Sequence, residues 1–220
     1  MTCLECGGTG VLLDGSPCPH CKQKELIFDA SCLTVPRDYR GIRFIKECLP
    51  EDLGCEYIDT MDTIYKSIID IKVKHRNYLI ASPPNSGKTI LCYSAIQALY
   101  AQNIPTFPLL DTGELRRIML DIDNGIKSFI LEGMDANTEF IYTAPMLFVK
   151  IPNLVTFSTI DTILTILDRR MRRSNNTIFI YNGTWEELLS IDKKHKLSSI
   201  SLDGTMGTVV VKTFERKEAK

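Results

Sequence analysis

The segment SPPNSGKT, residues 82–89, has the residue types that bind phosphate. Backbone N–H groups in such a turn, and at the start of a following helix, form a concavity that favours anions. Lys88 can reach the β and γ phosphates of a nucleotide, and Thr89 can offer its hydroxyl to magnesium. Ser82 stands where such a loop usually has its first glycine. The segment predicts a site for ATP and Mg²⁺ made by Ser82, Pro83, Pro84, Asn85, Ser86, Gly87, Lys88 and Thr89.

Four cysteines near the start of the chain form a second group that could do chemistry. They are two CxxC pairs: Cys3, Cys6, Cys18 and Cys21. Four thiolates at this spacing can hold one tetrahedral Zn²⁺, and such a closed site is structural. A redox dithiol is the alternative, and His20 could replace one thiolate. We expect residues 1–30 to form a small zinc ribbon that docks on protein rather than nucleic acid, because it has few basic residues and no aromatic residue before Phe28.

The composition is that of an ordinary globular protein. A chain of 220 residues suffices for one α/β domain with a small appendage. The net charge of −1 gives no overall attraction to nucleic acid or to a membrane surface. The chain has no long apolar run, and its first residues lack the pattern of a signal peptide. We therefore expect a cytoplasmic protein without a membrane partner.

The phosphate loop lies between a predicted strand and a predicted helix. Residues 31–76 are interpreted as a linker that ends in a helix, because apolar residues recur at helical spacing over 57–71: Ile58, Met61, Ile64, Tyr65, Ile68 and Ile69. The segment NYLIAS (77–82) predicts a buried strand, and the residues from Gly87 to about 103 predict a helix. A chance match to the loop would lack this context.

The rest of the chain alternates between strand and helix patterns. Further strands are predicted over 104–110, 146–151, 177–182 and 207–214. Helices are predicted over 111–122, 159–173 and 184–191, and 132–145 is expected to be irregular. Strands that alternate with helices indicate a parallel sheet with helices on both faces. The fold class expected for residues 77–220 is α/β, with a five-stranded parallel sheet.

The segment LDRRMRRSNNTIFIYNGTWEELLS (167–190) resembles the C-terminal half of the DnaC and IstB group of AAA+ ATPases, which load replicative helicases or assist transposition. The resemblance extends over about 78–211. It implies that 77–220 is an AAA+ P-loop core without a large lid. A cysteine-rich N-terminal module is common in phage and bacterial helicase loaders. The resemblance thus implies a phage-type loader that binds ATP, assembles head to tail, and docks on a hexameric helicase to place it on single-stranded DNA.

The same resemblance implies roles for three residues. Asn182 would be the sensor that positions the attacking water. Arg169 or Arg170 would be the finger that reaches the γ phosphate of a neighbouring subunit. The run RRMRR can also be read as a solvated helix face or as a patch that contacts DNA, as can KVKHR and KKHK.

The sequence departs from that family at two places. The family has an acidic pair at the end of the third strand, where this chain has Lys150 and Ile151. Ser198 and Ser199 lie where the family usually has an arginine that senses nucleotide. Both departures indicate weak or absent hydrolysis.

An acid from elsewhere could restore hydrolysis. Asp111 or Glu114 could supply it from the second strand, although a helix cap and a first-turn carboxylate explain both residues. The alternative function is an active DNA-dependent ATPase or small viral helicase, because PPNSGKT is also similar to the loop of viral helicases. A small-molecule kinase would use the loop but not the cysteine module.

Overall fold

The computed structural model describes residues 35–70, 77–102, 104, 106–131, 134–192, 197 and 208–211. The predicted zinc ribbon, with Cys3, Cys6, Cys18 and Cys21, lies outside these residues. Within the described ranges, no three or more His, Cys, Asp and Glu side chains gather as a metal site would require. None of the described helices has the length and apolar character needed to cross a membrane.

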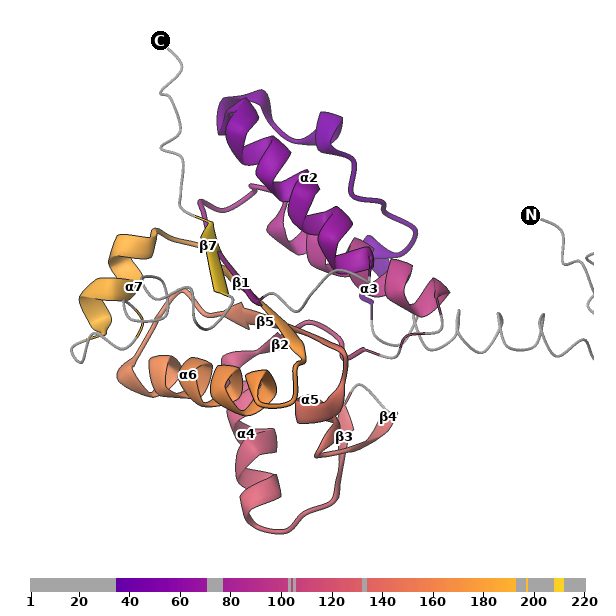
Figure 1. Ribbon diagram of the computed structural model, residues 1–220, viewed down its shortest axis with the longest axis vertical. Coiled ribbons are helices and arrows are strands. Elements are labelled where there is room, and N and C mark those ends of the chain that lie inside the picture. Colours follow the sequence, from indigo (N-terminus) through magenta and orange to yellow (C-terminus); the bar gives the residue numbers. More distant parts are fainter. Residues whose placement is uncertain are drawn as a thin grey trace, which may run out of the picture.

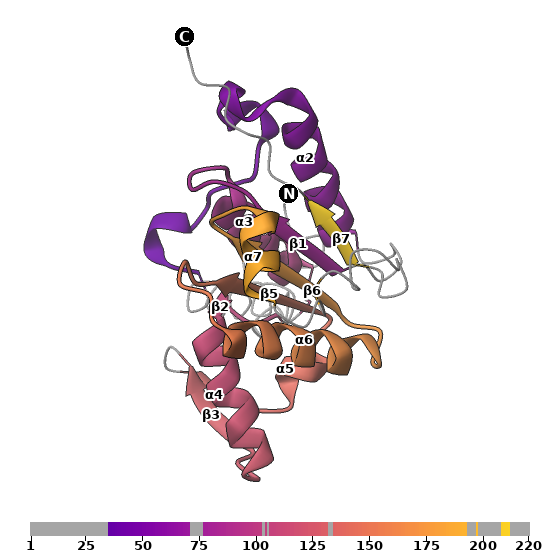
Figure 2. The same ribbon diagram turned by 90° about the vertical axis from the view of Figure 1, so that its left-hand side faces the viewer.

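A parallel sheet lies at the centre of the described part of the chain (Figures 1 and 2). Its strand order is β2 (Leu110–Asp111), β5 (Met146–Ile151), β6 (Asn176–Tyr181), β1 (Asn77–Ala81) and β7 (Thr208–Val211). Four of these strands have four to six residues, whereas β2, at one edge, has two. The sheet confirms the predicted α/β class with parallel strands.

The predicted strand over 104–110 is wrong for most of its length. Only Leu110 and Asp111 pair with β5, opposite Val149 and Lys150. Pro108 has no N–H to donate to a neighbouring strand. Upstream, the Thr106 hydroxyl donates to the backbone oxygen of Met146 at 3.1 Å, so a side chain ties this segment to the sheet.

Two helices cover one face of the sheet (Figure 1). They are α2 (Cys55–Ile69), which is the helix expected near 57–71, and α3 (Lys88–Ala101), which follows the phosphate loop. Three short 3₁₀ helices precede α2: η1 (Arg37–Tyr39), η2 (Lys46–Cys48) and η3 (Glu51–Leu53). In the core on this face, the two helices pack with Ile80 of β1, Phe148 of β5 and Ile180 of β6. The residues next to these along each strand point to the other face.

The other face packs against α4 (Thr112–Asp123), α5 (Phe140–Thr143), α6 (Phe157–Met171) and α7 (Trp185–Ile191). Capping boxes begin α4, α6 and α7, so the sequence specifies these starts locally. Between α4 and α5, β3 (Ser128–Leu131) and β4 (Met134–Asn137) form an antiparallel hairpin. Both β4 and α5 lie within 132–145, so the expectation of irregular structure is wrong there. The phosphate loop connects the end of β1 to the start of α3, so it lies at the carboxyl edge of the sheet.

Candidate functional site

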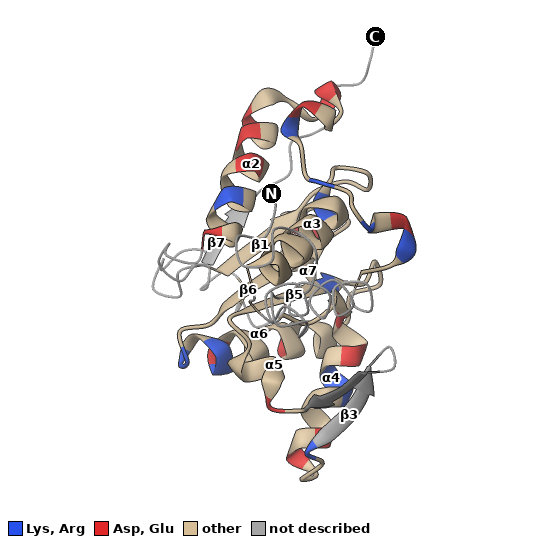
Figure 3. Ribbon diagram, turned by 90° about the vertical axis from the view of Figure 1, so that its right-hand side faces the viewer, with Lys and Arg blue, Asp and Glu red and all other residues tan. Residues whose placement is uncertain are grey.

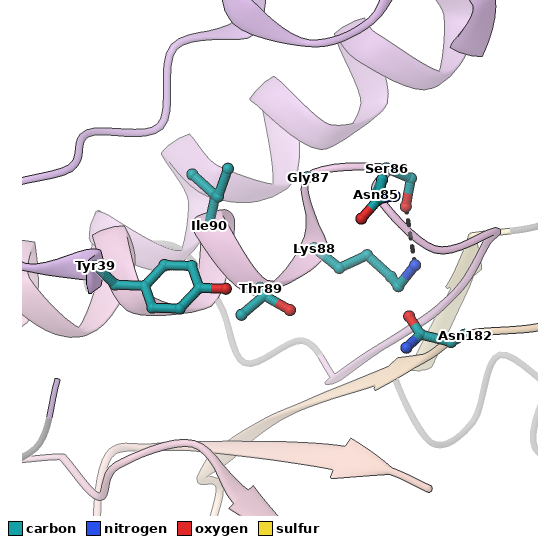
Figure 4. A pocket seen from close by; sticks show the side chains of 8 residues that line it. All are labelled: Tyr39, Asn85, Ser86, Gly87, Lys88, Thr89, Ile90 and Asn182. Atoms are coloured by element: carbon teal, nitrogen blue, oxygen red, sulfur yellow. Dashed lines mark hydrogen bonds between the residues drawn. The ribbon is translucent and has the colours of Figure 1, made fainter. Parts of the chain in front are cut away.

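A pocket of about 240 Å³ surrounds the start of α3, at the carboxyl ends of β1 and β6 (Figure 4). It is lined by Tyr39, Asn85, Ser86, Gly87, Lys88, Thr89, Ile90 and Asn182. Ala81 and Tyr181 are paired at the ends of the two strands, so Asn182 follows directly beside the loop. The structure therefore brings Asn182 together with five of the predicted loop residues. Ser82, Pro83 and Pro84 connect β1 to this lining.

The backbone of the loop needs two left-handed residues. Asn85 has φ 62° and Gly87 has φ 85°. Asparagine tolerates this conformation better than most side chains, and glycine adopts it freely. At Gly87 there is a second constraint, because an added Cβ would overlap Leu49 Cδ2, so the end of that side chain would have to move. Gly87 then begins the helix by accepting a hydrogen bond from Leu91 N at 2.9 Å.

The Lys88 ammonium group lies among oxygens of the loop (Figure 4). It donates to the backbone oxygens of Ser82 (2.8 Å) and Pro83 (2.7 Å). It also donates to the hydroxyls of Ser82 (3.0 Å) and Ser86 (2.9 Å). Burial lowers the pKa of Lys88 to about 8, and the charge of Lys150 acts in the same direction. The group is thus a buried cation with a pKa of about 8.

Tyr57 of α2 joins this cluster of hydroxyls, although the sequence did not single it out. Its hydroxyl lies 2.9 Å from Ser82 Oγ and donates to the backbone oxygen of Ser86 at 3.2 Å. Ser82 Oγ is in turn 2.7 Å from Ser86 Oγ. Burial raises the pKa of Tyr57, so the phenol stays protonated. Ser82, in place of the usual glycine, therefore links the loop to α2.

Tyr39 and Ile90 are two further pocket residues that the sequence did not indicate. Tyr39 comes from η1, and its ring centroid lies 4.7 Å from that of Tyr93 on α3. The side chain of Gln97 accepts from Gly41 N at 2.7 Å and donates to Tyr39 O at 3.1 Å. These contacts hold an aromatic ring beside the loop, where it can contact the base of a nucleotide.

Asp111 and Glu114, the two alternative acids, cap the start of α4. Asp111 Oδ1 accepts from Glu114 N at 2.7 Å, and Glu114 Oε2 accepts from Asp111 N at 2.8 Å. These bonds form a reciprocal capping box. The sequence favoured this interpretation, and it is confirmed.

The described lining of the pocket does not fit Mg²⁺. It contains no carboxylate, and Thr89 can offer the ion only a neutral hydroxyl. Mg²⁺ sites beside phosphates usually include one or two carboxylates. Lys150, which replaces the expected acid, brings a positive charge instead.

Arg170 lies in the core and far from the pocket. Its side chain is fully buried, and burial lowers its pKa to about 9. Its guanidinium donates to Ala144 O (2.8 Å), Asn176 O (2.6 Å) and Thr177 Oγ1 (2.9 Å). Asn176 is the first residue of β6, at the opposite end of that strand from Asn182. The Arg170 side chain is enclosed in the core, where oxygens of its own chain accept from its guanidinium, and its role as a finger stays a prediction.

Arg169 is partly exposed at the same end of α6. It donates to the Tyr142 hydroxyl at 2.6 Å and lies 3.8 Å from an Asp123 oxygen. Arg169 and Arg173 both lie over the Tyr142 ring, at 5.2 and 5.3 Å from its centroid. This basic end of α6 lies across the sheet from α3 (Figure 3). The structure does not bring Arg169 to the pocket, and its role as a finger stays a prediction.

The parallel sheet and the loop after β1 define the class as an α/β P-loop fold. No protein-family model matches the sequence, and no curated protein matches it either. Several solved structures match. The structure of DnaI matches at 17% identity and TM-score 0.53, and the match covers 86% of this chain and 99% of that chain. The DnaC helicase loader matches at 15% identity and TM-score 0.52, with coverages of 80% and 100%.

DnaA bound to AMPPCP and single-stranded DNA also matches, at 11% identity and TM-score 0.52. That match covers 78% of this chain and 50% of the DnaA chain. At these identities the likeness shows the fold alone. The particular fold is therefore the one that DnaC, DnaI and part of DnaA share, which supports the resemblance to DnaC found in the sequence.

Proposed function

We propose that this protein binds ATP in the pocket at the start of α3 and acts as a loader of a replicative DNA helicase. One observation carries the proposal: a phosphate loop and Asn182 meet at the carboxyl edge of a parallel sheet, in a fold like that of the DnaC helicase loader. Ligands of open α/β sheets bind at this edge.

In the proposed complex, the N–H groups at the start of α3 and Lys88 hold the phosphates of ATP. Lys88 leaves its loop oxygens to do so. Tyr39 and Ile90 supply the aromatic and apolar surface for the base. The bound AMPPCP of the DnaA structure, an ATP analogue, supports nucleotide as the ligand.

We propose that hydrolysis is weak or absent. Asn182 can orient a water molecule, but the described pocket lining has no carboxylate to accept its proton. Asp111 and Glu114 are engaged in the cap of α4. ATP then acts as an assembly ligand, which shifts the protein toward the state that binds nucleotide better.

The partners in this proposal are a hexameric helicase, single-stranded DNA and further copies of this chain arranged head to tail. The cysteine module at residues 1–30 is proposed to bind Zn²⁺ and to dock on the helicase. The likeness to DnaC supports the helicase as partner, and the DNA in the DnaA structure supports single-stranded DNA.

The proposal is tested with purified full-length protein and the replicative helicase of its source. Binding of a fluorescent ATP analogue and transfer of helicase to circular single-stranded DNA are measured for the wild type and Lys88→Ala. Lys66→Ala, an exposed lysine of α2, is the control. We expect Lys88→Ala alone to lose nucleotide binding and loading. A wild type that neither binds ATP nor transfers helicase would contradict the proposal.

Phosphate release from ATP, with and without single-stranded DNA, separates the proposed loader from an active DNA-dependent ATPase. We expect no release above the level of Lys88→Ala. Release that DNA stimulates would show that an acid outside the described pocket lining completes the site, and would favour the alternative.

A further inference from the structure

Lys150 lies on the same face of the sheet as the phosphate loop. Side chains alternate along a strand, and Phe148 of β5 packs in the core beneath α2 and α3. Lys150, two residues further on, has the same facing and is exposed near the end of β5. Its register partner is Ile180, which packs in that same core and is followed two residues later by Asn182. Lys150 is therefore placed at the edge of the pocket.

The positive charge of Lys150 acts on the ammonium group of Lys88. The main cause of the lowered pKa of Lys88 is burial, and repulsion by Lys150 adds to it. None of the ion pairs found in the described residues includes Lys150. Asp111 is its register partner on β2, but an oxygen of that carboxylate caps α4. With Lys88 in its lining and Lys150 at its edge, the pocket is bordered by two cations.

A pocket bordered by two cations suits an anion better than it suits a divalent cation. In the described lining, Thr89 offers a metal ion only a neutral hydroxyl oxygen. Lys150 occupies the position at which a metal-binding carboxylate is expected. A free nucleoside triphosphate carries more negative charge than its magnesium complex. Two ammonium groups can compensate that charge directly, as point charges that bind phosphate oxygens.

We infer that the pocket binds the metal-free nucleoside triphosphate in preference to its magnesium complex, with Lys150 in the charge-compensating role that magnesium has elsewhere. The inference rests on the proposed nucleotide site. It makes Lys150 a ligand of phosphate, and it explains the proposed weak or absent hydrolysis by the absence of a metal in the complex.

The test is calorimetric titration of the full-length protein with ATP, in excess EDTA and in excess magnesium chloride at equal ionic strength. For the wild type we expect affinity about tenfold higher in EDTA. Lys150→Met keeps the aliphatic stem, and we expect it to lose that preference through weaker binding in EDTA. Lys150→Asp restores an acid, and we expect binding to be stronger with magnesium. Lys66→Met, on the exposed side of α2, should behave as the wild type.

The outcomes separate the inference from the function beneath it. Binding that needs magnesium in the wild type would overturn the inference and leave the nucleotide site intact. An EDTA preference that survives in Lys150→Met would also overturn it, because the second cation would then be another residue. Absence of binding under both conditions, in a folded protein, would remove the nucleotide site and the inference together.

Discussion

The hydroxyl of Tyr57 on α2 lies 2.9 Å from the hydroxyl of Ser82 in the phosphate loop. This contact joins the first residue of the loop to α2, the helix that precedes β1 in the chain. A glycine at this position could not make the contact. The serine that departs from the usual loop pattern is thus a connection between the pocket and α2.

Tyr57→Phe removes this hydroxyl and keeps the buried ring. Ser82 Oγ and Ser86 O lose a partner, which costs about 1 kcal/mol, and the loop becomes less ordered. We expect roughly fivefold weaker ATP binding by calorimetry. Tyr65→Phe, a partly buried tyrosine of the same helix, is the control. Equal affinities for the two variants would show that the contact does not support the site.

Gly87→Ala tests the two constraints on that residue. An alanine at this position costs about 1–2 kcal/mol because of the left-handed conformation. Its Cβ also overlaps the end of the Leu49 side chain. Gly125→Ala meets the first cost alone, because nothing lies within 4 Å of its added Cβ. We expect urea unfolding to show a larger loss of stability for Gly87→Ala, with loss of ATP binding.

The added variant Leu49→Ala separates the collision from the strain. In the background of Gly87→Ala it opens the space that the new Cβ needs. We expect it to restore part of the ATP affinity. If Gly87→Ala and Gly125→Ala lost equal stability, the contact with Leu49 would be irrelevant.

From the lowered pKa of Lys88 we predict that nucleotide binding depends on pH. Its pKa of about 8 means that the ammonium form, which binds phosphate, disappears as the pH rises through that value. We expect ATP affinity to fall between about pH 7 and 9. Lys88→Arg keeps its charge over this range, and its affinity should stay flat. A wild type with constant affinity up to about pH 10 would contradict the lowered pKa.

The same group predicts how stability without nucleotide depends on pH. The pKa of Lys88 is lower in the folded protein than in the unfolded chain, so the unfolded chain binds more protons between the two values. Stability from this residue therefore rises with pH between about 8 and 10.5. The difference in unfolding free energy between the wild type and Lys88→Met should show this rise. A difference without slope would exclude it.

Arg170→Met removes the buried hydrogen bonds that the guanidinium donates to Ala144 O and Thr177 Oγ1. We expect a loss of roughly 2–5 kcal/mol in urea unfolding, because each buried acceptor that loses its donor costs about 1–3 kcal/mol. Arg169→Met, at the partly exposed neighbouring position, should cost less than about 1 kcal/mol. If the two variants were equally stable, the core role of Arg170 would be wrong.

Much of the fold could be predicted because its signals are local. The alternation of strand and helix patterns predicted the parallel sheet, and capping residues such as Thr156 and Thr184 mark helix starts within one turn. The strand at 104–110 was wrong because prolines interrupt an apolar run whose composition otherwise resembles a strand.

Less of the site could be predicted. The loop residues were identified by type and spacing, and Asn182 by resemblance. Tyr39 and Tyr57 were missed because their place beside the loop depends on packing between segments distant in the chain. Apolar spacing on α2 suggested Ile58 for the buried face, whereas Tyr57 lies there.

The sequence by itself determined the phosphate loop, the α/β class and the replacement of the expected acid by Lys150, since each is a property of neighbouring residues. The tertiary structure decided that Arg170 is buried, that Asp111 and Glu114 cap a helix, and that Lys150 shares a face with Lys88. The physical reason is strand register. Which side chains meet across a sheet depends on how strands from distant segments align, and a shift of one residue would turn Lys150 to the other face.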